Sequence, residues 1–241
     1  MNEPQAPRRL ARAEAVLAAR HRGLTVVLED AHDSHNISAV LRTCEAFGIQ
    51  DVHLVAELQS FTELNDAVTI GAHRWLTVHR HQGTENAIAA LRQAGYGIFV
   101  SHLDEGATPL PALPRNVRAA YVFGNERSGV TRAWIENADV RFVIPTSGFS
   151  GSLNLSVAAA LTIYDRLLGM PPAALPPGDL PAHEKTTLRA AWYRCLAGGS
   201  AELERAYRAY LENPPQPRPT FPRDHHRSPR RRPDQRSAEP G

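Results

Sequence analysis

Residues 144–154 combine residue types that could hold a polar ligand. Pro145 ends a predicted strand, because proline cannot donate to a sheet, and two glycines then permit sharp bends in a polar loop. Ser152 and Asn154 are typical of the start of a helix, and residues 155–161 are apolar or small on every face, which predicts a buried helix. Backbone N–H groups at its start could bind a polar group. An ordinary strand–loop–helix connection is the alternative.

Two more polar stretches follow predicted strands. The strand at 24–29 leads through a polar turn into a helix with Asn36 at its mouth and Arg42 in its first two turns. The strand at 119–123 runs into the glycine-bounded stretch 124–129. Ligand sites of parallel sheets lie outside the carboxyl ends of the strands, so we expect the three polar stretches to meet there. For Arg42, a surface salt bridge is the alternative.

The elements that must position these stretches alternate along the chain. Further strands are predicted at residues 49–55, 96–101 and 140–144, and a short one after the loop 71–75. Further helices are predicted at residues 8–20, 84–94, 131–137, 183–196 and 201–211. This alternation predicts a three-layer α/β fold with a mainly parallel sheet. The tightest histidine group, 79–81, is expected on an exposed strand and not in a catalytic site.

Composition fits one good-sized domain with or without appendages: 241 residues, 42% of them apolar. The net charge of +2 is unevenly spread, since residues 1–22 hold five Arg and two acids, residues 213–241 hold seven Arg and three acids, and the middle is therefore at −5. Basic ends suggest contact with RNA or DNA, a solvated surface being the alternative. Eight prolines and seven arginines predict a disordered tail at 213–241.

Several classes of protein are disfavoured. The first strand is not followed by a G-x-G-x-x-G motif, and the sequence has no Walker phosphate loop and no H-x-x-x-H or C-x-x-C pair, which weakens dinucleotide enzymes, NTPases and metal enzymes. Cys44 and Cys195 are too few for a disulfide scaffold. Nothing resembles a signal peptide or a membrane span, so a cytoplasmic protein without a metal is expected. The residues alone do not indicate a reaction.

Three motifs, residues 36–48, 123–129 and 144–158, resemble in order the signature motifs of the SpoU branch of SPOUT RNA 2′-O-ribose methyltransferases. The resemblance covers roughly residues 8 to 211. It implies a deep trefoil knot at the C-terminal side of the sheet, S-adenosylmethionine bound in the knot, and a homodimer formed by the knot regions. Within the family, the basic N-terminal helix and the C-terminal helices are most similar to the enzymes that methylate the conserved guanosine of the tRNA D loop.

The resemblance also implies site residues. The positions matched to cofactor binding are Ser101, His102, Leu103, Gly124, Ile144 and Leu153. The positions matched to the catalytic set are Asn36, Arg42, Glu126, Ser152 and Asn154. Family models give Arg42 the proton of the ribose 2′-OH, but a guanidinium is a poor base. We therefore expect Arg42 to bind the adjacent phosphate, with Asn36 and Glu126 fixing it, and the phosphate or a water to take the proton. Ser152 and Asn154 would order the loop and the substrate.

The expected organisation has four parts. They are a basic N-terminal helix at 1–22, a knotted catalytic domain at 23–170, a helical extension at 171–212 and the tail at 213–241. RNA contacts are expected from Arg8, Arg9, Arg12 and Arg20.

The leading function is a tRNA guanosine 2′-O-methyltransferase. The alternatives are a ribosomal RNA 2′-O-methyltransferase, including the type that confers antibiotic resistance, and a non-catalytic RNA-binding protein of the same fold. The absence of a separate RNA-binding domain before Leu24 favours tRNA. Two features depart from the family: Gly151 stands where a larger residue is common, and the tail has no counterpart.

Overall fold

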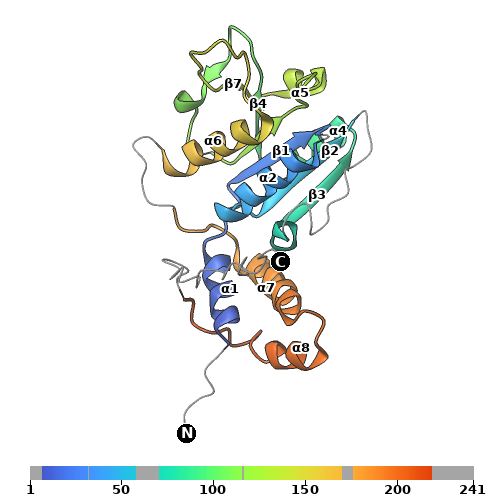
Figure 1. Ribbon diagram of the computed structural model, residues 1–241, viewed down its shortest axis with the longest axis vertical. Helices are drawn as coiled ribbons and strands as arrows, with labels where there is room; N and C mark the ends of the chain where they lie inside the picture. The colour runs from blue at the N-terminus through green and yellow to red at the C-terminus, as the bar shows by residue number, and fades with distance from the viewer. Residues whose placement is uncertain (1–6, 32, 58–70, 116, 170–175, 219–241) are drawn as a thin grey trace, which may run out of the picture.

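The computed structural model describes residues 7–31, 33–57, 71–115, 117–169 and 176–218. They contain a seven-stranded sheet in the order β3-β2-β1-β6-β4-β7-β5, in which every strand pairing is parallel (Figure 1). The strands are β1 (Leu24–Glu29), β2 (Asp51–Ala56), β3 (Thr77–Gln82), β4 (Gly97–Ser101), β5 (Thr108–Pro109), β6 (Ala119–Phe123) and β7 (Val140–Val143). The predicted parallel α/β fold is confirmed.

Helices cover both faces of this sheet. The α-helices are α1 (Arg8–Ala18), α2 (Ser34–Ala46), α4 (Thr84–Gln93), α5 (Arg132–Asn137), α6 (Leu155–Leu168), α7 (Ala182–Ala197) and α8 (Ala201–Arg208). The short 3-10 helices are η1 (Ala72–Trp75) and η2 (Leu110–Ala112). Helices α2 and α6 contribute to the core on one face, and α4 and α5 to the core on the other. This arrangement gives the predicted three layers.

Strand β1 shows why the central strands read as unbroken apolar runs. Val26 and Leu28 belong to the core under α2 and α6, whereas Val27, between them in sequence, belongs to the core under α4 and α5. Successive side chains of a strand point to opposite faces, so a strand covered on both sides must be apolar at every position. All six residues of β1 are buried.

Helices α1, α7 and α8 form a helical unit beside the sheet, which lies below it in Figure 1. Leu10 and Leu17 of α1 pack in one core with Trp192 and Tyr193 of α7. Glu14 is buried in this unit, where both of its carboxylate oxygens accept hydrogen bonds of 2.8 Å from the Arg189 guanidinium, and one also accepts from the Tyr193 hydroxyl. The helices expected in two separate segments, 1–22 and 171–212, therefore pack together.

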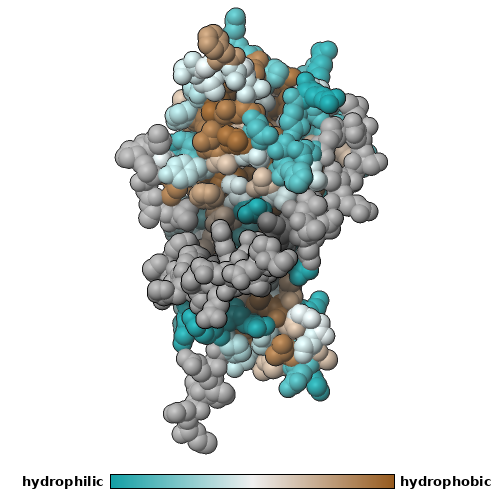
Figure 2. Space-filling view, in the orientation of Figure 1, coloured by the Kyte–Doolittle hydropathy of each residue, from teal (hydrophilic) through white to brown (hydrophobic). Residues whose placement is uncertain are grey.

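Helix α6 differs from its prediction. Leu155, Ala159 and Ile163 are buried against the sheet. On the opposite side, Val157, Leu161 and Tyr164 are 45%, 43% and 40% exposed, so the expectation of a helix buried on every face is wrong for the single chain. Figure 2 shows hydrophobic atoms gathered on the surface over α6.

Other expectations have mixed outcomes. The predicted strands and helices are present with ends shifted by up to three residues, and β5 was missed because two residues carry no periodicity. Residues 79–81 lie on the edge strand β3, as expected. Most of the predicted tail, 219–241, lies outside the described residues. Within the described part, no helix is long and apolar enough to cross a membrane.

Candidate functional site

Two of the three polar stretches, those after β6 and β7, meet with the residues that follow β4 and line a cavity of about 630 Å³. The stretch after β1 does not line this cavity, but its Asn36 hydrogen-bonds to Glu126 and Asn154 at the edge of the cavity. All six residues matched to cofactor binding line it: Ser101, His102, Leu103, Gly124, Ile144 and Leu153. Three of the catalytic set line it as well: Glu126, Ser152 and Asn154. The strand ends therefore bring the stretches after β6 and β7 together as expected, whereas the stretch after β1 joins them through Asn36 alone.

Asn36, Glu126 and Asn154 are joined side chain to side chain. The Asn36 amide donates to a carboxylate oxygen of Glu126 at 2.6 Å, and the Asn154 amide donates to the Asn36 side-chain oxygen at 3.1 Å. The side-chain oxygen of Asn154 also caps α6, because it accepts from the Ser156 backbone N–H at 2.9 Å. Asn154 thus fixes the helix start and holds Asn36, which in turn orients the Glu126 carboxylate.

Asn125 anchors the stretch between β6 and α5, and the sequence patterns did not single it out. Its side-chain amide donates to the carbonyl of Asp30 at the end of β1, and its side-chain oxygen accepts from the Arg127 backbone N–H at 2.8 Å. Asn125 is buried, so both bonds are shielded from water. Its neighbour Glu126 is exposed at the cavity. An Asn that bonds the backbone two residues on is a recognisable turn former, which is the signal that could have found it.

Gly124 is required by the packing of the chain around it. A Cβ atom built on it would lie 2.1 Å from the carbonyl carbon of Gly129 and 2.3 Å from the Val130 nitrogen. The stretch after β6 folds back so closely that only glycine fits. This crowding comes from the chain itself.

The loop after β7 offers open backbone groups. No residue from 146 to 153 hydrogen-bonds elsewhere in the described part of the chain. Residues 145–154 are all exposed. The backbone groups of the loop are thus available to a polar ligand, while Phe142 beneath them gives the cavity an apolar floor. This combination fits a ligand with an aromatic base and a polar ribose.

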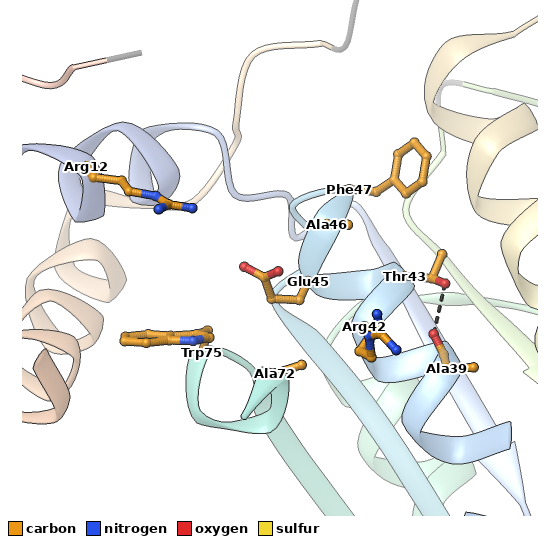
Figure 3. Close-up of a pocket in the computed structure, with 9 residues that line it drawn as sticks. All are labelled: Arg12, Ala39, Arg42, Thr43, Glu45, Ala46, Phe47, Ala72 and Trp75. Carbon is orange, nitrogen blue, oxygen red and sulfur yellow. Dashed lines mark hydrogen bonds between the residues drawn. The ribbon is translucent and has the colours of Figure 1, made fainter. Parts of the chain in front are cut away.

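Arg42 lies apart from the rest of the catalytic set. It is exposed on α2 and lines a second hollow, which it shares with Arg12 of α1 and Trp75 of η1 (Figure 3). Its side chain makes no hydrogen bond or ion pair within the described residues. The expectation that Asn36 and Glu126 would fix Arg42 is not met within one chain, where they hold each other instead.

Four arginines were expected to contact RNA, and three of them are exposed on α1. These are Arg8, Arg9 and Arg12. The expectation that Arg20 contacts RNA is wrong, because its side chain is fully buried. Its guanidinium donates to the carbonyl of Ile49 at 3.2 Å and lies 5.1 Å from the centre of the Trp192 ring. Burial lowers the pKa of Arg20 to about 10, against the opposing effect of Glu45. Arg20 joins the helical unit to α2 and is not placed to contact RNA.

These features of fold and site define a class of protein. The chain belongs to the SpoU rRNA Methylase family, whose model matches residues 23–164. It is 36% identical, over 76% of its length and 84% of the relative's, to a tRNA (guanosine(18)-2′-O)-methyltransferase of Borreliella burgdorferi. The protein of the same name from Escherichia coli K12 is 34% identical over 66% of this chain and 69% of the relative.

The fold is also that of solved structures. The A. aeolicus TrmH/SpoU tRNA modifying enzyme superposes with a TM-score of 0.63 over 85% of this chain and 95% of that chain, at 23% identity. An AdoMet-bound rRNA methyltransferase from Sinorhizobium meliloti superposes with a TM-score of 0.54 over 65% of this chain and 59% of that chain, at 23% identity.

Proposed function

We propose that this protein transfers a methyl group from S-adenosylmethionine to the ribose 2′-OH of the D-loop guanosine, position 18, of tRNA. The observation that carries the proposal is the chain of hydrogen bonds from Asn154 through Asn36 to Glu126 at the edge of the cavity. The names of the relatives, at 34–36% identity, support tRNA as the substrate. A chain that acts on tRNA would work in the cytoplasm.

The cavity would hold the cofactor through backbone groups. Ser101 ends β4 and is followed by His102 and Leu103. Gly124 follows β6, and Ile144 and Leu153 lie on the loop after β7. When bound, S-adenosylmethionine supplies the methyl group, whose carbon–sulfur bond breaks as the carbon–oxygen bond forms, with the electron pair staying on sulfur. Ser152 and Asn154 border the same cavity and would order the loop around the cofactor and the substrate.

The residues of the chain act on the 2′-OH, which is a poor nucleophile until it loses its proton. Arg42 would bind the neighbouring phosphate through its planar fork and so fix the ribose. A phosphate oxygen or a water would accept the proton, because a guanidinium stays charged at any working pH. Asn36 holds the Glu126 carboxylate at 2.6 Å and would thereby present it to the RNA or to the arginine.

Arg42 would reach a cavity in a second copy of the chain. Val157, Leu161 and Tyr164 form an exposed apolar face on α6, and Phe47, at the end of α2, packs edge-on against Tyr164 with ring centres 6.2 Å apart. An apolar face of this kind is suited to burial against another copy. A homodimer through α6 and the loop after β7, with the chain knotted there, would cover it and bring Arg42 of one subunit to the other subunit's site.

The test is incubation with methyl-labelled S-adenosylmethionine and total RNA, followed by nuclease mapping of the labelled nucleotide. We expect label in tRNA, on the 2′-oxygen of a D-loop guanosine. Label in ribosomal RNA alone would show that the substrate is ribosomal RNA, as in the alternative function, and not tRNA. No label in any RNA, with the cofactor bound, would leave the non-catalytic RNA-binding protein as the better description.

A further inference from the structure

A groove separate from the proposed cofactor cavity runs between α1 and α2, with η1 as its floor. It consists of two adjoining hollows of about 650 and 330 Å³ that share Arg12, Glu45 and Trp75. We call it the interhelical groove. One end carries Arg42, and the other end is lined by apolar side chains that include Trp192 and Leu196. The proposed methyl transfer gives this groove no role beyond its Arg42 end.

The charges of the interhelical groove favour a polyanion. Arg12 and Arg42 lie on either side of Glu45 in Figure 3, and neither has a hydrogen bond or ion pair within the described part of the chain. Among the described residues that line the groove, Glu45 is the one carboxylate, and its charge is balanced by Arg20, whose guanidinium lies 3.4 Å away. Two unpaired guanidinium groups along one groove suit successive phosphates of a nucleic acid strand.

Trp75 gives the same groove a flat aromatic floor. Its indole packs edge-to-face on Trp192, with ring centres 5.8 Å apart and planes at 89°, and its backbone carbonyl accepts from the Gln50 side chain at 3.3 Å. The packing on Trp192 thus orders the ring, and the Gln50 bond holds the backbone that carries it. Figure 3 shows the indole lying below Arg12, on the side of Glu45 opposite to Arg42. A fixed aromatic face beside cationic side chains is the arrangement that stacks an unpaired base.

We propose that the interhelical groove binds an unpaired nucleotide of the RNA substrate, with its base stacked on Trp75 and its flanking phosphates at Arg12 and Arg42. The inference rests on the proposed RNA methylation, and it adds a base-binding position to it. Because Arg42 is also assigned to the phosphate beside the target ribose, the stacked nucleotide lies close along the strand to the methylated one. The chain's own tail is disfavoured as occupant, although Arg218 bonds the Ala11 carbonyl, because the tail is as basic as the groove.

The experiment compares the full-length chain with three groove variants and one control. Trp75→Leu removes the aromatic face, Trp75→Phe keeps one, and Arg12→Gln removes a charge. Arg132→Gln is the matched control, because Arg132 is 88% exposed on α5 and belongs to neither site. Circular dichroism verifies folding, and calorimetry measures the affinity for S-adenosylmethionine. Binding and methylation of an unmodified tRNA transcript are then measured at several salt concentrations.

We expect Trp75→Leu to weaken tRNA binding about tenfold, since stacking on an aromatic side chain contributes on this scale, and to raise the Michaelis constant more than it lowers the maximal rate. Trp75→Phe should retain most of the wild-type affinity. Arg12→Gln should reduce the slope of log affinity against log salt concentration by about 0.7 to 0.9. Intrinsic fluorescence should be quenched by tRNA in the wild type and not in Trp75→Phe, because Trp134 and Trp192 are buried.

A folded Trp75→Leu chain with wild-type tRNA affinity would overturn the inference, as would equal quenching in Trp75→Phe. If Trp75→Leu does not fold, Trp75→Phe and Arg12→Gln decide the outcome through the quenching and the salt dependence. Failure of the proposed function is a separate result, because a wild-type chain that bound tRNA with quenching of Trp75 but methylated no RNA would retain the groove and lose the reaction.

Discussion

Arg42 is isolated from the other polar side chains of the site, and this isolation determines which contacts its guanidinium can make. Asn36, Glu126 and Asn154 bond one another, so none of these three side chains bonds the Arg42 guanidinium. A guanidinium that is exposed and unpaired among the described residues retains its full capacity for a bidentate phosphate contact. The role of Arg42 is thus a question of hydrogen-bond geometry as well as of charge.

Arg42→Lys separates these two properties. Lysine keeps the charge and loses the planar fork, so we expect turnover of tRNA at saturation to fall by about tenfold or more, with S-adenosylmethionine affinity unchanged. Single-turnover methylation and calorimetry measure the two quantities. The control is Arg132→Lys, in which both should remain at wild-type values. Near-normal turnover of Arg42→Lys would reject the bidentate role.

His53 provides a pH-dependent test of the sheet. It is buried on β2, its ring stacks on His79, and its Nδ1 lies 2.8 Å from Nε2 of His81. Burial, reinforced by the two neighbouring histidines and opposed by Asp51, lowers the pKa of His53 to about 3. The unfolded chain binds a proton near pH 6.5 that folded His53 does not bind, so stability is lost as the pH falls from about 6.5 toward 3.

Urea unfolding at pH 8 and pH 5 tests this assignment. The His53 contribution to the loss of stability over that interval is about 2 kcal/mol, because one pKa unit corresponds to about 1.4 kcal/mol. His53→Gln should therefore lose about 2 kcal/mol less than the wild type. His183→Gln, at an exposed histidine on α7, should behave as the wild type. An unchanged pH dependence in His53→Gln would contradict the assignment.

Single residues mark the limit of prediction from sequence. The matched motifs named nine residues that line the cavity, but Arg20 could not be told from the exposed arginines beside it, because burial depends on α2 and α7 and not on its neighbours in sequence. For Asn125, the local turn bond to Arg127 was open to prediction, but the bond to Asp30 at another strand end was not. Residue type indicates what a side chain can do, whereas tertiary contacts decide where it does it.

At the scale of elements, the turn after β6 depends on Gly124. Gly124→Ala would place a methyl group about 2 Å from the Gly129 and Val130 backbone, so the stretch that carries Glu126 must shift. We expect a loss of about 1–3 kcal/mol in stability and a loss of S-adenosylmethionine affinity, measured by urea unfolding and calorimetry.

Gly151→Ala is the matched control in the same cavity. A Cβ at Gly151 meets no atom within 4 Å, so stability should change by less than about 0.5 kcal/mol. Equal behaviour of the two variants would show that the packing of Gly124 does not position the site.

The elements themselves were largely predictable because their signals are local. Apolar runs bounded by glycine and polar turns located the strands of the sheet, and the 3.6-residue period located α2 and α4. The exposed side of α6 was not predictable, because Val157 and Leu161 are as apolar as the residues that face the sheet. Hydropathy cannot distinguish a side chain buried in its own core from one suited to burial against another molecule.

At the scale of the whole molecule, the exposed side of α6 and the position of Arg42 have the same proposed explanation. Phe47, directly after α2, lies against Tyr164 of the exposed face, and Arg42 is on α2 itself. A second copy seated on this face would meet Arg42 at its edge. If the site is shared in this way, each subunit of a dimer supplies a cavity to one site and an arginine to the other.

Mixed dimers test this sharing. Arg42→Ala removes the arginine and keeps the cavity, whereas Leu153→Asp introduces a charge into the cavity at a residue that is 36% exposed and keeps the arginine. Each variant alone should be inactive. In a mixed dimer, the intact cavity of the Arg42→Ala subunit meets the intact Arg42 of the Leu153→Asp subunit, and the other site has neither. A shared site therefore predicts one active site per mixed dimer.

Random pairing of equal amounts makes half of the dimers mixed, so co-expressed variants should recover about a quarter of the wild-type methylation activity. Separately purified variants combined without subunit exchange are the control and should stay inactive. Leu161→Asp should yield a folded monomer by sedimentation and abolish methylation, because the exposed face would no longer be buried. Sites contained within one chain would leave the mixed dimers without activity, and that result, with dimers present, would confine Arg42 to its own subunit.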